Sequence, residues 1–145
     1  MKTLFYPRLL VKLIAPKVHI KKGDEEYGTE FEWDTNTIYY TKENSLLDLG
    51  FMRHLREFHF FETPETYSTE LWTILHELGH YFNPDEEEDY DGKDECAFTS
   101  IEEAIKRPDL QNIYYNSPDE FAATEWAIEW INDHPKLAEW FSKRL

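Results

Sequence analysis

The chain has 145 residues, of which 41% are hydrophobic and 17% aromatic, which predicts a single folded domain over residues 1–145 and argues against extensive disorder. Its 30 acidic residues outnumber its 15 basic ones, and the net charge of −15 predicts repulsion from nucleic acids and attraction to basic partners. The single cysteine excludes an internal disulfide and no apolar run is long enough to cross a membrane, so we expect a soluble, cytoplasmic protein without a membrane partner.

The first part of the chain is predicted to be mostly strands. Residues 9–15 form a short apolar stretch that fits a helix or a strand equally well. Residues 17–21 alternate polar and apolar side chains, as a half-buried strand does. Residues 30–33 and 38–41 repeat this pattern on either side of an Asp-Thr-Asn turn, which predicts a β-hairpin. We therefore interpret residues 1–62 as strands and a hairpin for the most part.

The segment from Ser45 to Glu62 is ambiguous. Its leucines could begin a capped helix, whereas the aromatic run at residues 58–61 is typical of a strand. His54 and His59 are five residues apart, a spacing that would not let one helix present both to a metal ion. We interpret both histidines as packed or partly exposed side chains.

Residues 64–83 are predicted to form an amphipathic helix. Leucine or isoleucine recurs at helical spacing, at residues 71, 74, 75 and 78, which gives the helix one buried face. Thr63-Pro64 and Ser68 provide start signals, and Asn83 followed by proline provides a stop. Gly79 weakens the helix, and so small a residue could let another backbone approach closely.

This predicted helix carries the sequence His-Glu-Leu-Gly-His at residues 76–80. His76 and His80 are four residues apart, so they lie one turn apart on one face, with Cβ atoms roughly 5–6 Å from each other. Two imidazoles so placed can bind one zinc ion. Glu77 can then take a proton from a metal-bound water, as in zinc-dependent hydrolases.

An acidic segment over residues 84–97 follows the histidine motif. It partly imitates a calcium-binding loop, but Glu87 stands where such a loop begins with Asp, and Phe98 stands where it ends with Glu. We therefore predict a solvated acidic loop that could attract a basic substrate. Because residues 1–22 contain six basic residues and no acidic one, the rest of the chain carries −21.

The final part, residues 98–145, is predicted to be helical. Residues 100–107 form a short helix with a capping box, and residues 109–116 are interpreted as a connector. Residues 117–131 form a second strong helix, which Asp-His-Pro ends. Residues 136–145 form a closing amphipathic helix.

A catalytic zinc usually takes three protein ligands, so the chain should supply one more. Glu120 is the best candidate, because Ala123 and Ala127 lie on the same helical face and would let its helix press against the first. Glu120 also completes a capping box at the start of its own helix, a structural role that competes with metal binding. Glu125 and Asp119 are the alternative ligands.

The two motifs together resemble the small zinc peptidases of the ImmA/IrrE family, which belong to bacteria, phages and mobile elements. These are gluzincins of the HExxH type. The resemblance lies in His-Glu-Leu-Gly-His at residues 76–80 and Glu-x-x-Ala-x-x-Trp-Ala at residues 120–127, and extends over residues 66–131. The spacing between the motifs is longer here. Thr124 stands where the family has Asn or Asp, a residue that can orient a ligand histidine.

The resemblance implies a compact α+β fold of the zincin type, with a small sheet or hairpin packed on helices and the two motif helices at the core. It implies that His76, His80 and Glu120 bind Zn²⁺ and that Glu77 is the catalytic general base. It also implies an edge strand that holds the substrate, often a regulatory protein such as a repressor.

The sequence therefore predicts a zinc metallopeptidase that cleaves a protein or peptide substrate. The donor that stabilises the developing oxyanion stays open among Tyr114, Tyr115 and His134. One alternative is a non-catalytic acidic protein that binds a basic host protein by imitating nucleic acid. Another keeps the zinc but uses it only to stabilise a scaffold.

Overall fold

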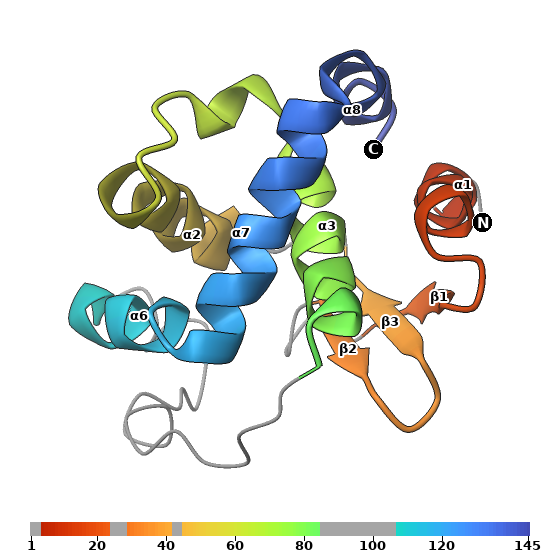
Figure 1. Ribbon diagram of the computed structural model, residues 1–145, viewed down its shortest axis with the longest axis horizontal. Coiled ribbons are helices and arrows are strands. Elements are labelled where there is room, and N and C mark those ends of the chain that lie inside the picture. Colours follow the sequence, from red (N-terminus) through yellow and green to blue (C-terminus); the bar gives the residue numbers. More distant parts are fainter. Residues whose placement is uncertain (1–3, 24–28, 42–44, 85–106) are drawn as a thin grey trace.

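The computed structural model describes residues 4–23, 29–41, 45–84 and 107–145 (Figure 1). Within these residues the fold is α+β, with six α-helices and one mixed three-stranded sheet. The predicted acidic loop falls outside the described residues except for Pro84, and the predicted helix over residues 100–107 falls outside them except for Arg107. None of the described helices is both long and apolar enough to cross a membrane.

The first helix, α1 (Phe5–Ile14), contains most of the apolar stretch for which the sequence left helix and strand open. Pro7 is tolerated because it lies in the first turn, where its missing N–H has no helical partner. Leu10 and Val11 are buried, and the helix packs against β1 and α3. The helix thereby covers one side of the sheet.

The sheet contains β1 (His19–Lys22), β2 (Glu30–Glu32) and β3 (Thr37–Tyr40) in the order β1-β3-β2. β1 runs parallel to β3, and β2 pairs with β3 in an antiparallel hairpin. The hairpin and the preceding strand are confirmed as the alternating sequence predicted them. Asn36 adopts a φ of 49° in the turn, a left-handed conformation that asparagine tolerates.

Residues 45–58 form helix α2 (Ser45–Phe58), so the helical alternative holds for this ambiguous segment and the strand at residues 58–61 is wrong. Phe60, with a φ of 58°, turns the chain after the helix, and Phe61 donates its backbone N–H to the Leu55 carbonyl at 3.1 Å. The prediction of mostly strands over residues 1–62 is also wrong. α1 and α2 hold 10 and 14 residues, whereas the strands hold 4, 3 and 4.

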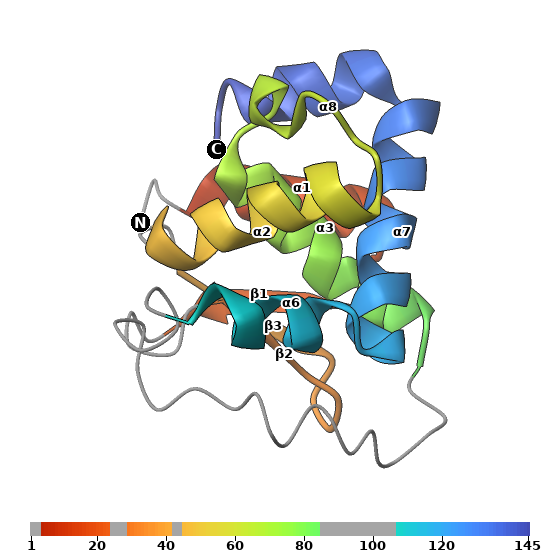
Figure 2. The same ribbon diagram turned by 90° about the vertical axis from the view of Figure 1, so that its left-hand side faces the viewer.

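The central helix is α3 (Thr69–Phe82). The predicted start at residue 64 is wrong, because Pro64–Thr66 form a separate 3-10 turn, η2. Ser68 caps α3 as predicted, because its Oγ accepts from the Leu71 N–H at 3.2 Å. The helix ends at Asn83, whose side chain donates to the Gly79 carbonyl. α3 packs on the sheet, on α1, on α2 and on the two last helices, so it lies at the middle of the fold (Figures 1 and 2).

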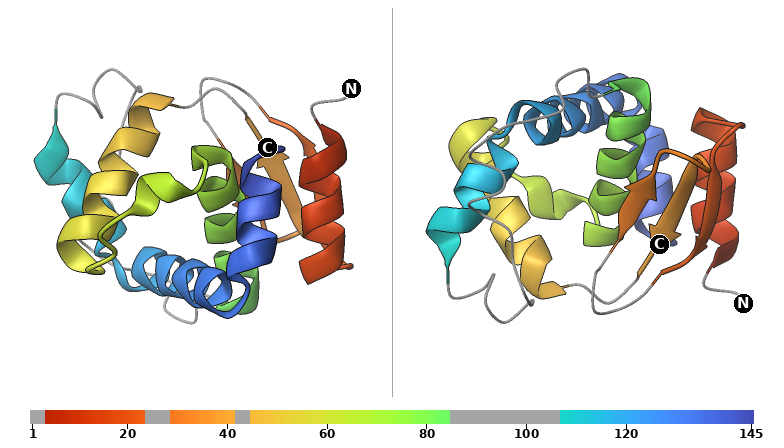
Figure 3. Two further views of the ribbon diagram at one scale, coloured as in Figure 1. Left: turned by 90° about the horizontal axis from the view of Figure 1, so that it is seen from above. Right: turned by 90° about the horizontal axis from the view of Figure 1, so that it is seen from below.

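The chain closes with α6 (Pro108–Tyr115), α7 (Pro118–Asp133) and α8 (Pro135–Ser142). α7 and α8 are confirmed where the sequence predicted them. The connector predicted at residues 109–116 is wrong, because α6 occupies it, with proline at its first position. Seen from above and below, α7 crosses alongside α3 while α6 lies next to α2 (Figure 3).

Candidate metal centre

The close packing of α3 and α7 depends on small residues at their contact. A Cβ atom at Gly79 would lie 2.3 Å from the carbonyl oxygen and 2.8 Å from the Cα of Ala123, which is closer than atoms can approach. Ala123 and Ala127 are both fully buried on the facing side of α7. Glycine at residue 79 therefore allows the two backbones to meet, as its position in the motif suggested.

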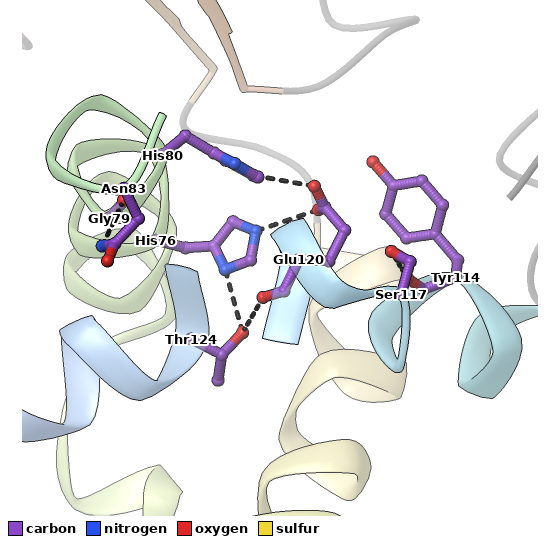
Figure 4. A network of polar contacts seen from close by, with 8 residues as sticks. All are labelled: His76, Gly79, His80, Asn83, Tyr114, Ser117, Glu120 and Thr124. Carbon is purple, nitrogen blue, oxygen red and sulfur yellow. Dashed lines mark hydrogen bonds and ion pairs between the residues drawn. The ribbon is translucent and has the colours of Figure 1, made fainter. Parts of the chain in front are cut away.

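This contact brings together His76 and His80 from α3 and Glu120 from the first turn of α7 (Figure 4). His76 Nε2 lies 3.1 Å from Glu120 Oε1, and His80 Nε2 lies 2.8 Å from Glu120 Oε2. One donor atom from each of the three residues falls within 4.8 Å of the others. Among the described residues, these three side chains form a group whose geometry could hold a metal ion.

The competing role of Glu120 as a helix cap is not realised. Ser117 makes no side-chain cap to α7; its Oγ instead donates to the Tyr114 carbonyl at 2.6 Å. The carboxylate of Glu120 turns towards the two histidines. Of the alternative ligands, Glu125 pairs with His59 at 2.8 Å, and Asp119 lies outside the three-residue group.

Thr124 forms a hydrogen bond with the ring of His76. Its Oγ1 donates to the Glu120 carbonyl at 3.0 Å, so it accepts from Nδ1–H of His76, which also lies at 3.0 Å. The Nδ1–H tautomer leaves Nε2 with a free lone pair directed at the centre. One hydroxyl thus connects the backbone of one candidate ligand to the ring of another.

The electrostatics of the three groups favour a bound cation. Burial lowers the pKa of His76, against the influence of Glu120, so its imidazole tends to be neutral. Two acceptors, the Nε2 lone pair and a carboxylate oxygen, then face each other at 3.1 Å. A cation between them would replace this repulsion with two favourable contacts, so the residues fit a metal ion of the zinc type.

Glu120 and His80 form the charged part of the centre. Burial alone would raise the pKa of Glu120, but the two neighbouring imidazoles of His76 and His80 hold it well below its usual range. Burial opposes protonation of His80 too, yet the hydrogen bond to Glu120 and the nearby carboxylates raise its pKa to about 9. The carboxylate of Glu120 is therefore anionic at neutral pH.

Glu77 and Tyr114 complete the surroundings of the centre. Glu77 is only 9% exposed, and its charge helps raise the pKa values of His80 and Tyr114. Tyr114, from the end of α6, directs its hydroxyl towards the side where Glu120 lies (Figure 4). Burial, followed by the charges of Glu120 and Glu77, raises its pKa well above the usual 10.

The two other candidate oxyanion donors lie elsewhere. Tyr115 packs against Phe51 and His54, with ring centroids at 5.4 and 5.3 Å. His134 is exposed at the far end of α7, where its Nδ1 bonds the Trp130 carbonyl at 3.0 Å. Tyr114 is thus the one of the three candidates that reaches the metal-binding group.

The histidines expected to be packed are packed. His54 is fully buried, its Nε2 lies 3.0 Å from Asn116 Oδ1, and burial lowers its pKa to about 4. The side chain of His59 is fully buried and pairs with Glu125. Both stay outside the metal-binding group, as their spacing in the sequence indicated.

A row of aromatic side chains near the centre was missed by sequence reasoning. Phe31 of β2 contacts Trp33 and Tyr81, Tyr81 contacts Phe82, and Phe82 stacks on Trp126 of α7 at 5.0 Å. These residues come from three elements, so no local pattern could reveal that they form one row. The row connects β2 to the end of α3 that carries His80.

Comparison with known proteins gave no match: no family model fits the chain, and neither a curated protein nor a solved structure is significantly similar to it.

Proposed function

We propose that this protein is a zinc-dependent metallopeptidase that hydrolyses a peptide bond in a protein substrate. The observation that supports this most strongly is the meeting of two imidazole nitrogens of α3 with the carboxylate of Glu120 of α7 within 4.8 Å. Catalytic zinc sites use such a donor set and keep a further position for water or substrate. The resemblance of the two motifs to ImmA/IrrE peptidases supports the same assignment and a zincin-like fold.

In this proposal His76, His80 and Glu120 hold the zinc ion, and Glu77 is the general base. Bound zinc supplies a Lewis acid that makes an attacking water acidic and polarises the scissile carbonyl. Glu77 follows His76 on the same helix, and in this proposal it accepts the proton of that water and passes it to the leaving amine. Its burial keeps the carboxylate from being screened by bulk water.

Tyr114 is the residue that we assign to stabilising the oxygen that gains negative charge. A donor is required there, and a phenol whose pKa is raised well above 10 stays protonated at neutral pH. The charges of Glu120 and Glu77 both act on the hydroxyl of Tyr114 and raise its pKa, which supports a role for this hydroxyl beside the reacting carbonyl.

The substrate implied by the family resemblance is a regulatory protein such as a repressor. The net charge of −15 favours a basic protein or a basic segment of one, because opposite charges attract over about a Debye length.

The decisive experiment pairs elemental analysis with cleavage of a peptide library read by mass spectrometry. Wild type should contain about one zinc ion per chain and should cleave peptides. Glu77→Gln should keep the zinc and lose cleavage, whereas His76→Ala and Glu120→Ala should lose the zinc. A wild type that takes up no zinc after reconstitution, or a Glu77→Gln variant as active as wild type, would overturn the proposal.

The alternative function is a non-catalytic acidic protein that binds a basic host protein, and the excess of acidic residues is the observation that favours it. Such binding should weaken steeply with salt and should not need the metal. A zinc-stabilised scaffold should need the metal but should tolerate Glu77→Gln. The same set of variants therefore separates all three functions.

A further inference from the structure

β2 is the outer strand of the described sheet on the side of α3. It pairs with β3 and packs against α3, so one of its edges faces away from the sheet (Figures 1 and 3). The ring of Phe31 lies 6.0 Å from that of Tyr81, the residue after His80. An extended peptide that added a strand to β2 would therefore run beside the metal-binding end of α3.

The two faces of β2 differ sharply in chemistry. Phe31 is half-buried and faces α3, where it belongs to the aromatic row described above. Glu30 and Glu32 are exposed and point to the opposite face. They stand on that face together with Tyr39, whose pKa is raised first by a hydrogen bond with Glu32, then by burial and by the charges of Glu32 and Glu30. The outer face of this edge therefore carries two carboxylates two residues apart.

We propose that this edge selects extended segments with basic residues at alternate positions, paired with Glu30 and Glu32, and apolar residues between them. The role in cleavage rests on the proposed function, whereas the binding itself does not. Period-two alternation in a strand sends one set of side chains towards the carboxylates and the other towards the aromatic row. The substrate class is thus a basic, amphipathic segment that can become a strand.

The physical basis is the pairing of side chains across neighbouring strands. Residues directly opposite each other have Cβ atoms roughly 4.5–5.5 Å apart, so a lysine opposite Glu30 or Glu32 lies within reach of an ion pair. Backbone hydrogen bonds of the added strand supply affinity for any sequence, and the side-chain pairs supply the preference. The aromatic row offers apolar contact to the intervening residues, with Trp33 44% and Phe82 43% exposed.

A simpler role for the two glutamates is protection of an exposed strand edge from association with another chain. That role needs charge of either sign, so lysines would serve it equally well. The selective role needs negative charge at these two residues in particular. Charge reversal therefore distinguishes the two roles.

The test uses zinc-loaded Glu77→Gln protein, in which bound peptide would not be consumed, and measures binding by fluorescence anisotropy. The probes are three labelled short peptides: one in which two lysines alternate with valines, its glutamate counterpart, and a scrambled peptide in which the two lysines are adjacent. The alternating lysine peptide should bind about tenfold more tightly than the glutamate peptide, because two opposite-charge pairs replace two like-charge pairs. It should also bind more tightly than the scrambled peptide, whose adjacent lysines place only one of the two on the face of the glutamates.

The reversal variant is Glu30→Lys/Glu32→Lys, which should now prefer the glutamate peptide. Its matched control is Glu57→Lys/Glu62→Lys, which changes the net charge equally at exposed residues at and beyond the end of α2, on the other side of α3 (Figure 1). The control should keep the preference for the alternating lysine peptide. Equal loss of preference in the control, or equal binding of the scrambled peptide, would overturn the proposal in favour of general attraction to an acidic protein.

Hydrolysis by the wild-type zinc protein then separates this inference from the function on which it rests. If peptides bind with the expected preference but are not cleaved, the selective role of the β2 edge is supported and the proposed peptidase activity is contradicted. Cleavage without any preference for alternating basic residues would support the peptidase activity and contradict the selective role of the β2 edge.

Discussion

Two clusters of side chains in the described part of the chain contain the same residue types, two histidines and one glutamate of α7, yet only one of them has metal-binding geometry. In the first, His76 and His80 converge on Glu120. In the second, His59 pairs with Glu125, while His54 turns to Asn116. The arrangement of the donor atoms, and not the presence of the residues, therefore makes a candidate metal site.

The cause of the difference begins in the backbone. His76 and His80 occupy consecutive turns of α3, so both side chains leave the helix on one face. His54 lies within α2, but His59 comes just after the helix ends at Phe58, so no helical geometry aligns the two rings. Aromatic stacking then fixes them, with Phe58 on His54 at 4.8 Å and Phe121 on His59 at 4.0 Å.

Exposure of the carboxylates separates the clusters further. The side chain of Glu120 is 5% exposed, whereas that of Glu125 is 47% exposed. A buried carboxylate between two imidazoles interacts strongly with charge, while an exposed one is screened by water. The second cluster therefore serves packing and a hydrogen bond, and its two histidines are kept neutral by burial.

The largest expected effect is loss of zinc from the first cluster alone. His76→Ala and Glu120→Ala should each weaken zinc affinity by at least about 100-fold, because each removes a donor atom rather than a supporting contact. His59→Gln and Glu125→Gln should leave zinc affinity unchanged. Competition with a chromophoric chelator measures all four. Equal loss of zinc in the two sets would contradict the distinction between the clusters.

The next effect tests the helix contact that brings the first cluster together. Gly79→Ala should destabilise the fold by about 1–3 kcal/mol or more, since the added Cβ would meet the backbone of Ala123 rather than a side chain that can move. Zinc affinity should fall too, as α7 carries Glu120. Thermal unfolding and zinc titration measure the two changes.

A control for this substitution comes from the exposed surface of α7, the helix that packs against Gly79. Glu129 is exposed on α7, and Glu129→Ala should change the free energy of unfolding by no more than about 0.5 kcal/mol. If Gly79→Ala proved as harmless as this control, close packing at Gly79 would not be what holds the centre together.

The sequence predicted the first cluster well because its strongest signal is local. The spacing of His76 and His80, the serine cap and the stop at Asn83 all act within one helix, and they place its end correctly, although the helix begins at Thr69 and not at residue 64. The assignment of Glu120 as the third ligand was harder, because Ser117 and Glu120 also match the sequence of a helix capping box. The corner between α6 and α7 decides it, where the hydroxyl of Ser117 goes to Tyr114.

In other parts of the chain, local sequence patterns were insufficient to predict the secondary structure. The short apolar runs of α1 and α2 fit strands and helices alike, and tertiary packing decided for helices. In α6 the proline and aspartate at the start are helix signals, but the helix has only 8 residues, too few for a helical period to be recognised in the sequence. The placement of β2 and Tyr114 beside the centre depends on contacts between distant segments, which no spacing within the sequence records.

A smaller effect should come from Thr124, which orients His76. Thr124→Val removes the hydroxyl at nearly constant shape and should weaken zinc affinity by about 10- to 100-fold, as the loss of such outer partners does elsewhere. Thr124→Ser should restore most of the affinity. Zinc titration measures both, and rescue by serine separates hydrogen bonding from packing.

Thr73 of α3 supplies the matched control, because its hydroxyl also bonds a carbonyl four residues back, that of Thr69 at 2.7 Å. Thr73 is not bonded to a ligand histidine, so Thr73→Val should leave zinc affinity as it is. A similar loss in both variants would assign the effect to helix α3 or α7 in general and not to the orientation of His76.

The smallest effect is a difference in sign between the clusters in the pH dependence of stability of the zinc-free protein. The pKa of His80 is raised to about 9, so its contribution is complete below about 6.5 and is lost as the pH rises through 9. The pKa of His54 is lowered to about 4, so its contribution is present above about 6.5 and is lost as the pH falls towards 4. Urea unfolding of wild type, His80→Gln and His54→Gln in the presence of a chelator measures both. His80→Gln should flatten the alkaline side of the stability profile and His54→Gln the acidic side. The reverse assignment, or one profile for all three proteins, would mean that the two clusters do not differ in charge.

Because zinc would displace the proton that His80 holds, zinc binding at pH 7–8 should also release protons. This release should vanish in His80→Gln but persist in His54→Gln.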